Sequence, residues 1–178
     1  MGAIWTLNSA MESKTKTNLS HGLPAPNKKP GHQSLRRGRV SMPGQIYNIT
    51  SVTVSRDPFF TNFLAGCAAA RCFEDDRLLG DARMLAWVLM PDHAHWLIQT
   101  GDIDKLETVV NRLKSASARQ VNRVLGRTGA LWQRAYYDHA LRTDEDIVTV
   151  ARYIVANPIR AGLVQRAGDY SFWNAVWL

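Results

Sequence analysis

The sequence predicts an α+β protein in which a single antiparallel sheet carries helices mainly on one of its faces. Two observations support this fold class. Short segments alternate apolar and polar residues, as half-buried strands do, and longer segments place apolar residues at helical spacing. The two kinds of segment follow one another in the order βαββαβα, and a chain of 178 residues suffices for one such domain with a core of its own.

The expected elements are, in order, a strand over 46–53, a helix over 59–73, strands over 82–90 and 93–99, a helix over 104–125, a strand over 131–141 and a helix over 143–156. Residues 82–90 are apolar on both faces, which is typical of a central strand. Asp57-Pro58 ends the first strand, and Pro91-Asp92 makes a tight turn. This order of elements is that of the ferredoxin-like and RRM-like sandwiches.

The helix over 104–125 has the clearest amphipathic pattern. Its predicted core stripe consists of Leu106, Val109, Val110, Leu113, Ser117, Val121 and Val124. For the last helix, Thr143 and the acidic residues after it favour an N-terminal cap, and Pro158 ends or kinks it. Cys67 and Cys72 are predicted to be small core residues, and with no further cysteine to complete a zinc cluster they suit a reducing compartment.

The net charge of +7 is concentrated near the N-terminus. Residues 1–39 contain seven basic residues and one acidic residue, whereas residues 40–178 contain 15 basic and 14 acidic residues. This distribution excludes a protein that coats nucleic acid with its whole surface, but it allows a basic arm on a balanced domain. Residues 1–36 have little apolar periodicity and are predicted to be a disordered basic tail, followed by one domain over 37–178.

Neither a membrane span nor a secretion signal is expected. No stretch approaches the roughly 18 consecutive apolar residues of a transmembrane helix. The N-terminus lacks an apolar segment followed by a small-residue cleavage site. We therefore expect a cytoplasmic protein without a membrane partner.

His93 and His95 lie at positions i and i+2 of the strand predicted over 93–99. Residues at this spacing share one face of a strand, so the two imidazoles can form a clamp for a divalent metal. Such a pair is more often structural or solvent-facing. The hydrophobic strand before it and the turn at Asp92 favour the metal interpretation.

Tyr153 and Asn157 are four residues apart, which places them on one face of the last predicted helix. The ordinary interpretation is a half-buried aromatic residue and a helix-terminal residue before proline. The functional alternative is a phenol nucleophile one turn away from an amide oxygen that could complete a metal site.

These two motifs resemble those of the REP-associated tyrosine transposases, which are single-tyrosine relatives of the HUH endonuclease superfamily. His93-Ala94-His95 matches the HUH element, and residues 153–164 match the pattern Tyr-Ile-x-x-Asn-Pro-x-Arg-x-Gly-x-Val. Supporting matches are residues 38–50, Leu-Trp-Gln at 131–133, Asp138-His139 and Asp-Tyr-Ser-Phe-Trp at 169–173. The resemblance covers residues 37–173.

The resemblance implies a metal-dependent enzyme that cleaves and rejoins single-stranded DNA at palindromic, hairpin-forming repeats, and therefore a cytoplasmic protein associated with the nucleoid. His93 and His95 would hold Mg²⁺ or Mn²⁺, with Asn157 as the third ligand. Tyr153 would attack the scissile phosphate, forming a 5′-phosphotyrosine intermediate and a free 3′-hydroxyl.

Three residues near the motifs need separate interpretation. Ala94 is small where the family often has a bulky hydrophobic residue, and on the strand it points away from the metal. Asp92 is a candidate partner for one of the imidazoles. His139 lies either at the edge of the site or in a structural role, and it is left out of the metal set.

The predicted DNA contacts are Arg36, Arg37, Arg39, Arg112, Arg119 and Arg123. The first three border the first strand and are expected near a short single-stranded tag beside the hairpin. The other three follow Lys105 along the helix over 104–125 and could track the phosphates of the stem, although a solvated face is the ordinary interpretation. The strand aromatics Trp96, Trp132, Tyr136 and Tyr137 are either core residues or platforms for unpaired bases.

Two other functions are compatible with this fold. A catalytically silent, RRM-like DNA-binding module would need neither the histidine pair nor Tyr153, so the presence of all three ranks it below the enzyme. A metal-dependent hydrolase would use the histidine pair and water, with Tyr153 only structural. The sequence leaves the choice between monomer and homodimer open.

Overall fold

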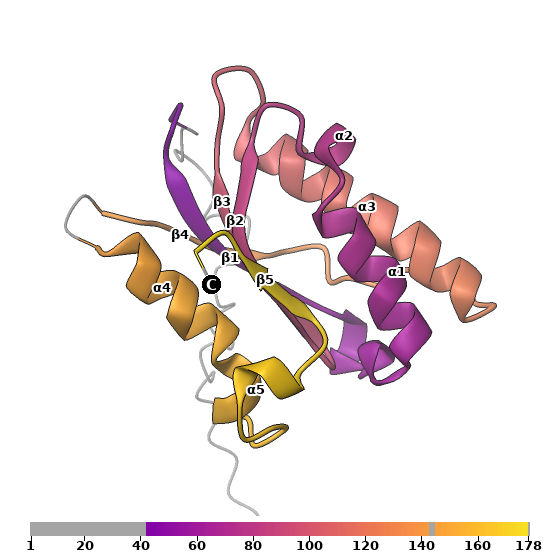
Figure 1. Cartoon of the computed structure of the whole chain (residues 1–178). Helices are drawn as coiled ribbons and strands as arrows, with labels where there is room; N and C mark the ends of the chain where they lie inside the picture. Colours follow the sequence, from indigo (N-terminus) through magenta and orange to yellow (C-terminus); the bar gives the residue numbers. More distant parts are fainter. Residues whose placement is uncertain (1–41, 143–144, 178) are drawn as a thin grey trace, which may run out of the picture. The chain divides into compact units, whose positions relative to one another are not determined.

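The computed structural model describes residues 42–142 and 145–177. Within them the chain forms a five-stranded antiparallel sheet in the order β4-β1-β3-β2-β5 (Figure 1). Its strands are β1 (Ile46–Val52), β2 (Arg83–Met90), β3 (His93–Gln99), β4 (Tyr137–Ala140) and β5 (Trp173–Ala175). The predicted α+β class with one antiparallel sheet is confirmed, and the predicted tail over 1–36 lies outside the described residues.

The α-helices are α1 (Phe63–Phe73), α2 (Asp76–Leu79), α3 (Leu106–Val124), α4 (Ile147–Val155) and α5 (Asn157–Arg160). Three short 3₁₀ turns, η1 (Val54–Arg56), η2 (Phe59–Thr61) and η3 (Ala167–Asp169), complete the elements of the described residues. No helix in these ranges is both long and apolar enough to cross a membrane.

The sheet carries a separate apolar core on each face. Trp87 and Trp96 belong to the core that α1 and α3 cover, whereas Val88 and Leu97, their neighbours in sequence, belong to the core that α4 covers. Figure 1 shows α1 and α3 on one side of the sheet and α4 on the other. The helices therefore lie mainly on one face, as predicted, but α4 is the exception, and this exception positions the candidate site.

The first half of the domain follows the predicted elements closely. The helix predicted over 59–73 is divided, because residues 59–61 form the turn η2 and α1 starts only after Asn62. The Asn62 side chain accepts a bond from the Ala65 amide at 3.0 Å, which caps the first turn of α1. Pro91-Asp92 joins β2 to β3 in the expected hairpin, with Met90 opposite His93.

The second half departs from the prediction in several elements, of which the first two are a strand and the start of a helix. The strand predicted over 131–141 is reduced to β4, because Trp132 turns into the core and its indole N–H donates to the buried Ser117 Oγ at 2.9 Å. Trp132 keeps only an isolated bridge to Thr53. The last helix begins with Asp146 as its cap rather than at Thr143, which lies outside the described residues.

The short elements at the C-terminal end were not predicted. The helix expected through residue 156 stops at Val155, and α5 begins at Asn157. β5 pairs with the outer edge of β2 and has only three residues. The predicted core stripe of α3 is buried except for Val124, which is 43% exposed at the end of the helix. Cys72 is buried as predicted, burial raises the pKa of its thiol, and Cys67 is half-buried.

Candidate metal and nucleophile site

His93 and His95 lie on the same face of β3, as the sequence predicts, with ring centroids 5.0 Å apart. Leu97 continues this alternation and packs in the same core as Ile154 of α4. The two imidazoles therefore stand on the face of the sheet that α4 covers.

The Nδ1 atom of each imidazole has a hydrogen-bond partner. His93 Nδ1 lies 2.5 Å from Asp92 Oδ1, and His95 Nδ1 lies 2.9 Å from Thr50 Oγ1 across the β1–β3 ladder. A carboxylate only accepts, so Nδ1 of His93 donates this bond. In the neutral ring this leaves Nε2 of His93 with its lone pair, which is the arrangement typical of metal-binding histidines.

The pKa shifts of His95 and Asp92 keep the imidazole of His95 neutral and the carboxyl of Asp92 ionised. Burial lowers the pKa of His95 to about 4, and the charges of His93 and Arg160 act in the same direction. The imidazole of His95 is therefore neutral near pH 7 and can offer a lone pair. Partial burial raises the pKa of Asp92, but the bonds from His93 and Arg56 outweigh it, so the pKa lies below its ordinary value and the carboxyl is ionised.

Tyr153 stands on α4 with 60% of its surface exposed. Its neighbour Ile154 is buried against the sheet. An exposed phenol is accessible to a large substrate, so the sequence-based alternative of a half-buried aromatic residue does not describe it.

Asn157 opens α5 and has both ends of its amide engaged. Its Nδ2 donates to the Ile154 carbonyl at 2.8 Å, and its Oδ1 accepts from Arg160 at 2.6 Å. These two bonds fix the orientation of the amide, with one lone pair of Oδ1 remaining for another partner. α4 contacts β3, and the charge of Arg160, which binds Asn157, lowers the pKa of His95, so the helix with the tyrosine motif packs on the side of the sheet that carries the histidine pair.

Sequence reasoning missed three residues of this site. Thr50 orients His95, Arg56 binds the carboxylate of Asp92 at 3.0 Å, and Arg160 contacts both Tyr153 and Asn157. The only available signal was for Arg160, which occupies the arginine position of the motif at 153–164. Thr50 and Arg56 approach the site from a different strand and a turn, and no local pattern relates them to the histidines.

The predicted DNA contacts have different surroundings. Arg36, Arg37 and Arg39 lie outside the described residues. Arg112 is only about one-third exposed and forms an ion pair with Asp104. Arg119 and Arg123 are exposed on α3, which covers the face of the sheet opposite to the histidine pair.

The aromatic residues divide in a similar way. Trp96 and Trp132 are buried in the core and unavailable for stacking on bases, whereas Tyr137 is 59% exposed. Tyr137 is the β4 partner of Thr50, whose partner on β3 is His95, so these three residues form one row across the sheet. His139 Nε2 binds Glu145 at 3.0 Å, a contact between β4 and the start of α4.

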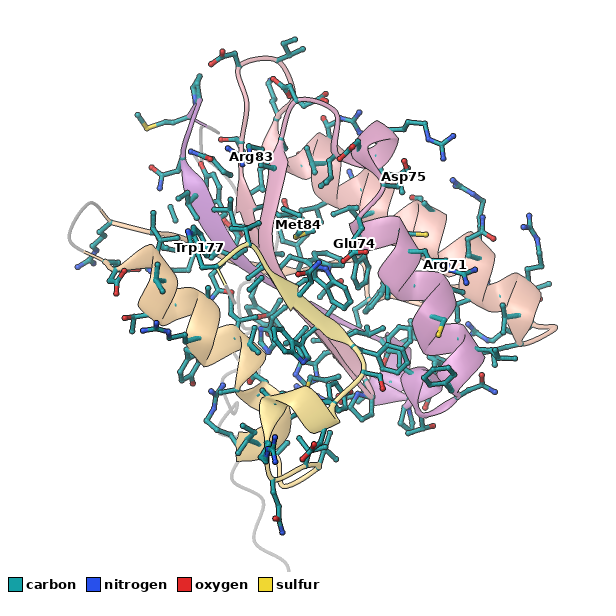
Figure 2. All side chains as sticks on the ribbon, in the orientation of Figure 1. Arg71, Glu74, Asp75, Arg83, Met84 and Trp177 are labelled. Carbon is teal, nitrogen blue, oxygen red and sulfur yellow. The ribbon has the colours of Figure 1, made fainter. Side chains whose placement is uncertain are left out.

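A cavity of about 300 Å³ lies elsewhere, between the end of α1 and the strands β2 and β5. Glu74, Arg83 and Met84 are among its lining residues and are labelled at this edge in Figure 2. None of the residues predicted for catalysis, metal or DNA belongs to its lining.

Comparisons with known proteins show the family to which this chain belongs. The model of the family described as IS200-like transposases matches residues 43–157, a range that contains the histidine pair, Tyr153 and Asn157. A REP-associated tyrosine transposase of Haemophilus influenzae is 31% identical over 98 residues, covering 49% of this chain and 56% of that protein. A REP-associated tyrosine transposase of Escherichia coli K12 is 30% identical over 89 residues, covering 49% of this chain and 50% of that protein. The chain thus spans about half the length of the curated relatives it matches.

Among solved structures, the chain is similar to a REP-associated tyrosine transposase bound to a REP hairpin. The TM-score is 0.59 at 22% sequence identity, and the match covers 76% of this chain and 79% of the other. At this identity the likeness concerns the fold, and it supports the α+β class. The family resemblance predicted from the histidine and tyrosine motifs is confirmed by the family match.

Proposed function

Because the chain belongs to the IS200-like transposase family, we propose that it is a metal-dependent endonuclease and transposase that cleaves and rejoins single-stranded DNA at hairpin-forming repeats. The observation that supports this proposal most strongly is the convergence of two distant motifs. His93 and His95 on β3 stand on the face of the sheet that is covered by α4, the helix that carries Tyr153. A DNA-binding module without catalysis would not need this arrangement.

The donor set fits a hard divalent cation, Mg²⁺ or Mn²⁺. His93 and His95 would offer Nε2, and Asn157 would offer Oδ1, the amide oxygen that such ions accept. In the part of the chain that the structure describes, no three His, Cys, Asp or Glu side chains form a metal-binding group, and the proposed third ligand is an amide. When bound, the cation polarises the scissile phosphate and offsets its developing charge.

Tyr153 would be the nucleophile. Its phenol oxygen forms a bond to phosphorus and the bond from phosphorus to the 3′-oxygen breaks, while the phenol proton leaves to solvent and the 3′-oxygen gains one. The products are a 5′-phosphotyrosine link and a free 3′-hydroxyl. Attack of a 3′-hydroxyl on this link reverses the step, which allows strands to be joined.

The proposed partner is a palindromic repeat in which a hairpin stands beside a short single-stranded tag. Its support is the relative solved with a REP hairpin. Arg119 and Arg123, which are exposed on α3, would contact the phosphates of the hairpin stem. Arg36, Arg37 and Arg39 would contact the single-stranded tag. Arg112 was predicted beside Arg119 and Arg123 and remains a weaker candidate, because its guanidinium pairs with Asp104. The reaction would take place in the cytoplasm, on the nucleoid.

The proposal is tested by whether the protein forms a covalent adduct with DNA. End-labelled hairpin DNA is incubated with the protein and Mn²⁺ and run on a denaturing gel. We expect a protein–DNA band with the wild type and none with Tyr153→Phe, because the ring remains but the nucleophilic oxygen is lost. Tyr137→Phe is the matched control, since Tyr137 is equally exposed and shares a row of the sheet with His95, and its adduct should persist.

The two alternative functions, a metal-dependent hydrolase and a catalytically silent DNA-binding module, predict different results on this gel. Cleavage that survives Tyr153→Phe would support the water-dependent hydrolase. Hairpin binding without any cleavage by the wild type would support the silent module. Either result contradicts the proposed transposase.

A further inference from the structure

Tyr153 and Asn157 do not belong to one continuous helix. α4 ends at Val155, and α5 begins at Asn157 with Pro158 in its first turn. Between them, Ala156 has φ −78° and ψ 0°, and its amide bonds back to Arg152 and Ile154. The geometry of a continuous helix therefore does not fix the position of the Tyr153 side chain relative to the Asn157 amide.

Arg160 connects the two sides of this break. Its Nη1 donates to the Tyr153 carbonyl at 2.7 Å and its Nη2 donates to Asn157 Oδ1 at 2.6 Å. Its guanidinium carbon lies 3.6 Å from the centroid of the Tyr153 ring. One planar side chain thus holds the backbone of α4, the ring of the nucleophile and the amide of the proposed third ligand.

We propose that Arg160 is the positioning residue of this site, holding the Tyr153 ring and the Asn157 amide in one fixed relation. The inference rests on the proposed function and adds a residue to it. An exposed tyrosine ring has many accessible orientations, and stacking of a cation on its face restricts them. The bond to Oδ1, together with the bond from Nδ2 to Ile154, keeps the Asn157 oxygen in place.

The contacts require the shape of arginine as well as its charge. The guanidinium is planar and presents donors in a fixed fork, so it stacks on a ring and donates in two directions at once. A lysine ammonium at this position would keep the charge but lose the stack and one of the bonds. Arg160→Lys therefore tests whether Arg160 positions Tyr153 and Asn157 or only attracts DNA by its positive charge.

The first measurement is the rate of adduct formation at saturating hairpin DNA. We expect Arg160→Lys to lower this rate about 100-fold, the effect of a small misplacement of reacting groups, while the dissociation constant of the hairpin and the melting temperature stay unchanged. Arg166→Lys, at an exposed arginine beyond α5, is the matched control and should behave as wild type. A hairpin affinity that falls as much as the rate would make Arg160 a DNA contact and overturn the proposal.

The second measurement does not depend on cleavage. Mn²⁺ binding is followed by electron paramagnetic resonance in wild type, Arg160→Lys, Asn157→Ala and the double variant. We expect Arg160→Lys to weaken Mn²⁺ binding about 10-fold, as loss of a partner that orients a metal ligand does. Because Arg160 acts through Asn157, the double variant should bind no more weakly than Asn157→Ala alone.

The outcomes distinguish this inference from the function it rests on. Wild-type rates and Mn²⁺ affinity in Arg160→Lys would overturn the inference and leave the transposase intact. A wild-type protein that forms no adduct and binds no Mn²⁺ would overturn both.

Discussion

At the scale of single residues, the two histidines are oriented by different kinds of partner. His95 depends on the Thr50 hydroxyl, whereas His93 depends on the carboxylate of Asp92, which Arg56 also binds. Ser55 and Arg56 have φ values of 54° and 56°, in the left-handed region that residues with a side chain rarely adopt. Strain of this kind costs on the order of 1–3 kcal/mol per residue. It persists here in the turn that brings Arg56 to Asp92.

His95→Ala should abolish adduct formation and leave hairpin binding unchanged. Loss of partners that only orient a metal ligand costs about 10–100-fold, so removal of the ligand should lower the rate by more than about 100-fold. Gel-shift titration with the same hairpin measures binding separately. His139→Ala is the matched histidine replacement, since His139 binds Glu145 rather than Asp92 or Thr50, the partners of the histidine pair. If His95→Ala also abolished binding, His95 would be structural rather than a metal ligand.

At the scale of elements, α4 must start correctly for Tyr153 to reach its position, and Asp146 provides this start. Bonds from the Thr149 hydroxyl and the Val148 amide hold the pKa of Asp146 below its ordinary value. A carboxyl with a lowered folded pKa stabilises the protein above its unfolded pKa, and this contribution is lost as the pH falls through the folded value. The cap of α4 should therefore weaken in acid.

We expect the melting temperature of the wild type to fall more than that of Asp146→Asn between about pH 5 and about pH 2. An asparagine oxygen can still accept the bond from Val148, but it does not titrate in this range. Calorimetry at several pH values measures the difference. Asp102→Asn, at an exposed residue of the loop before α3, should follow the wild-type curve. Parallel curves for wild type and Asp146→Asn would contradict the role of Asp146.

Elements with strong local patterns could be predicted, and those set by distant contacts could not. The bounds of β3 are as predicted, and α3 differs by one or two residues at each end, because each has a clear period along the chain. β5 is too short for any period, and its pairing with β2 is a tertiary contact. For the site, residue spacing predicted the histidine pair, but the bridge from Arg160 across the break after Val155 depends on an α5 that periodicity did not predict.

At the scale of the whole described domain, the segment that contains Tyr170 and Phe172 connects the sheet to α1. Tyr170 donates its hydroxyl to the Leu89 carbonyl at 2.7 Å, and burial raises the pKa of this phenol to about 12. The Leu89 amide in turn donates to the Phe172 carbonyl at 2.9 Å. The ring of Phe172 then packs against α1 at Gly66, where no side chain intervenes.

Gly66→Ala should destabilise the protein through this contact. An added Cβ would lie 2.5 Å from Cζ of Phe172, so the ring has to move. Overpacking of this kind costs about 1–3 kcal/mol, whereas alanine gains about 1 kcal/mol over glycine inside a helix. We expect a net loss of up to about 2 kcal/mol in urea unfolding, with an unchanged m-value.

The sign of this effect should reverse when the ring is removed. In a Phe172→Ala background, only the helix preference remains, so adding Gly66→Ala should stabilise the protein by about 1 kcal/mol. Gly168→Ala is the control for glycine replacement, since nothing lies within 4 Å of its added Cβ, and its effect should stay within about 0.5 kcal/mol. If Gly66→Ala were equally destabilising with and without the Phe172 ring, the close packing of the Phe172 ring on α1 would not be the cause.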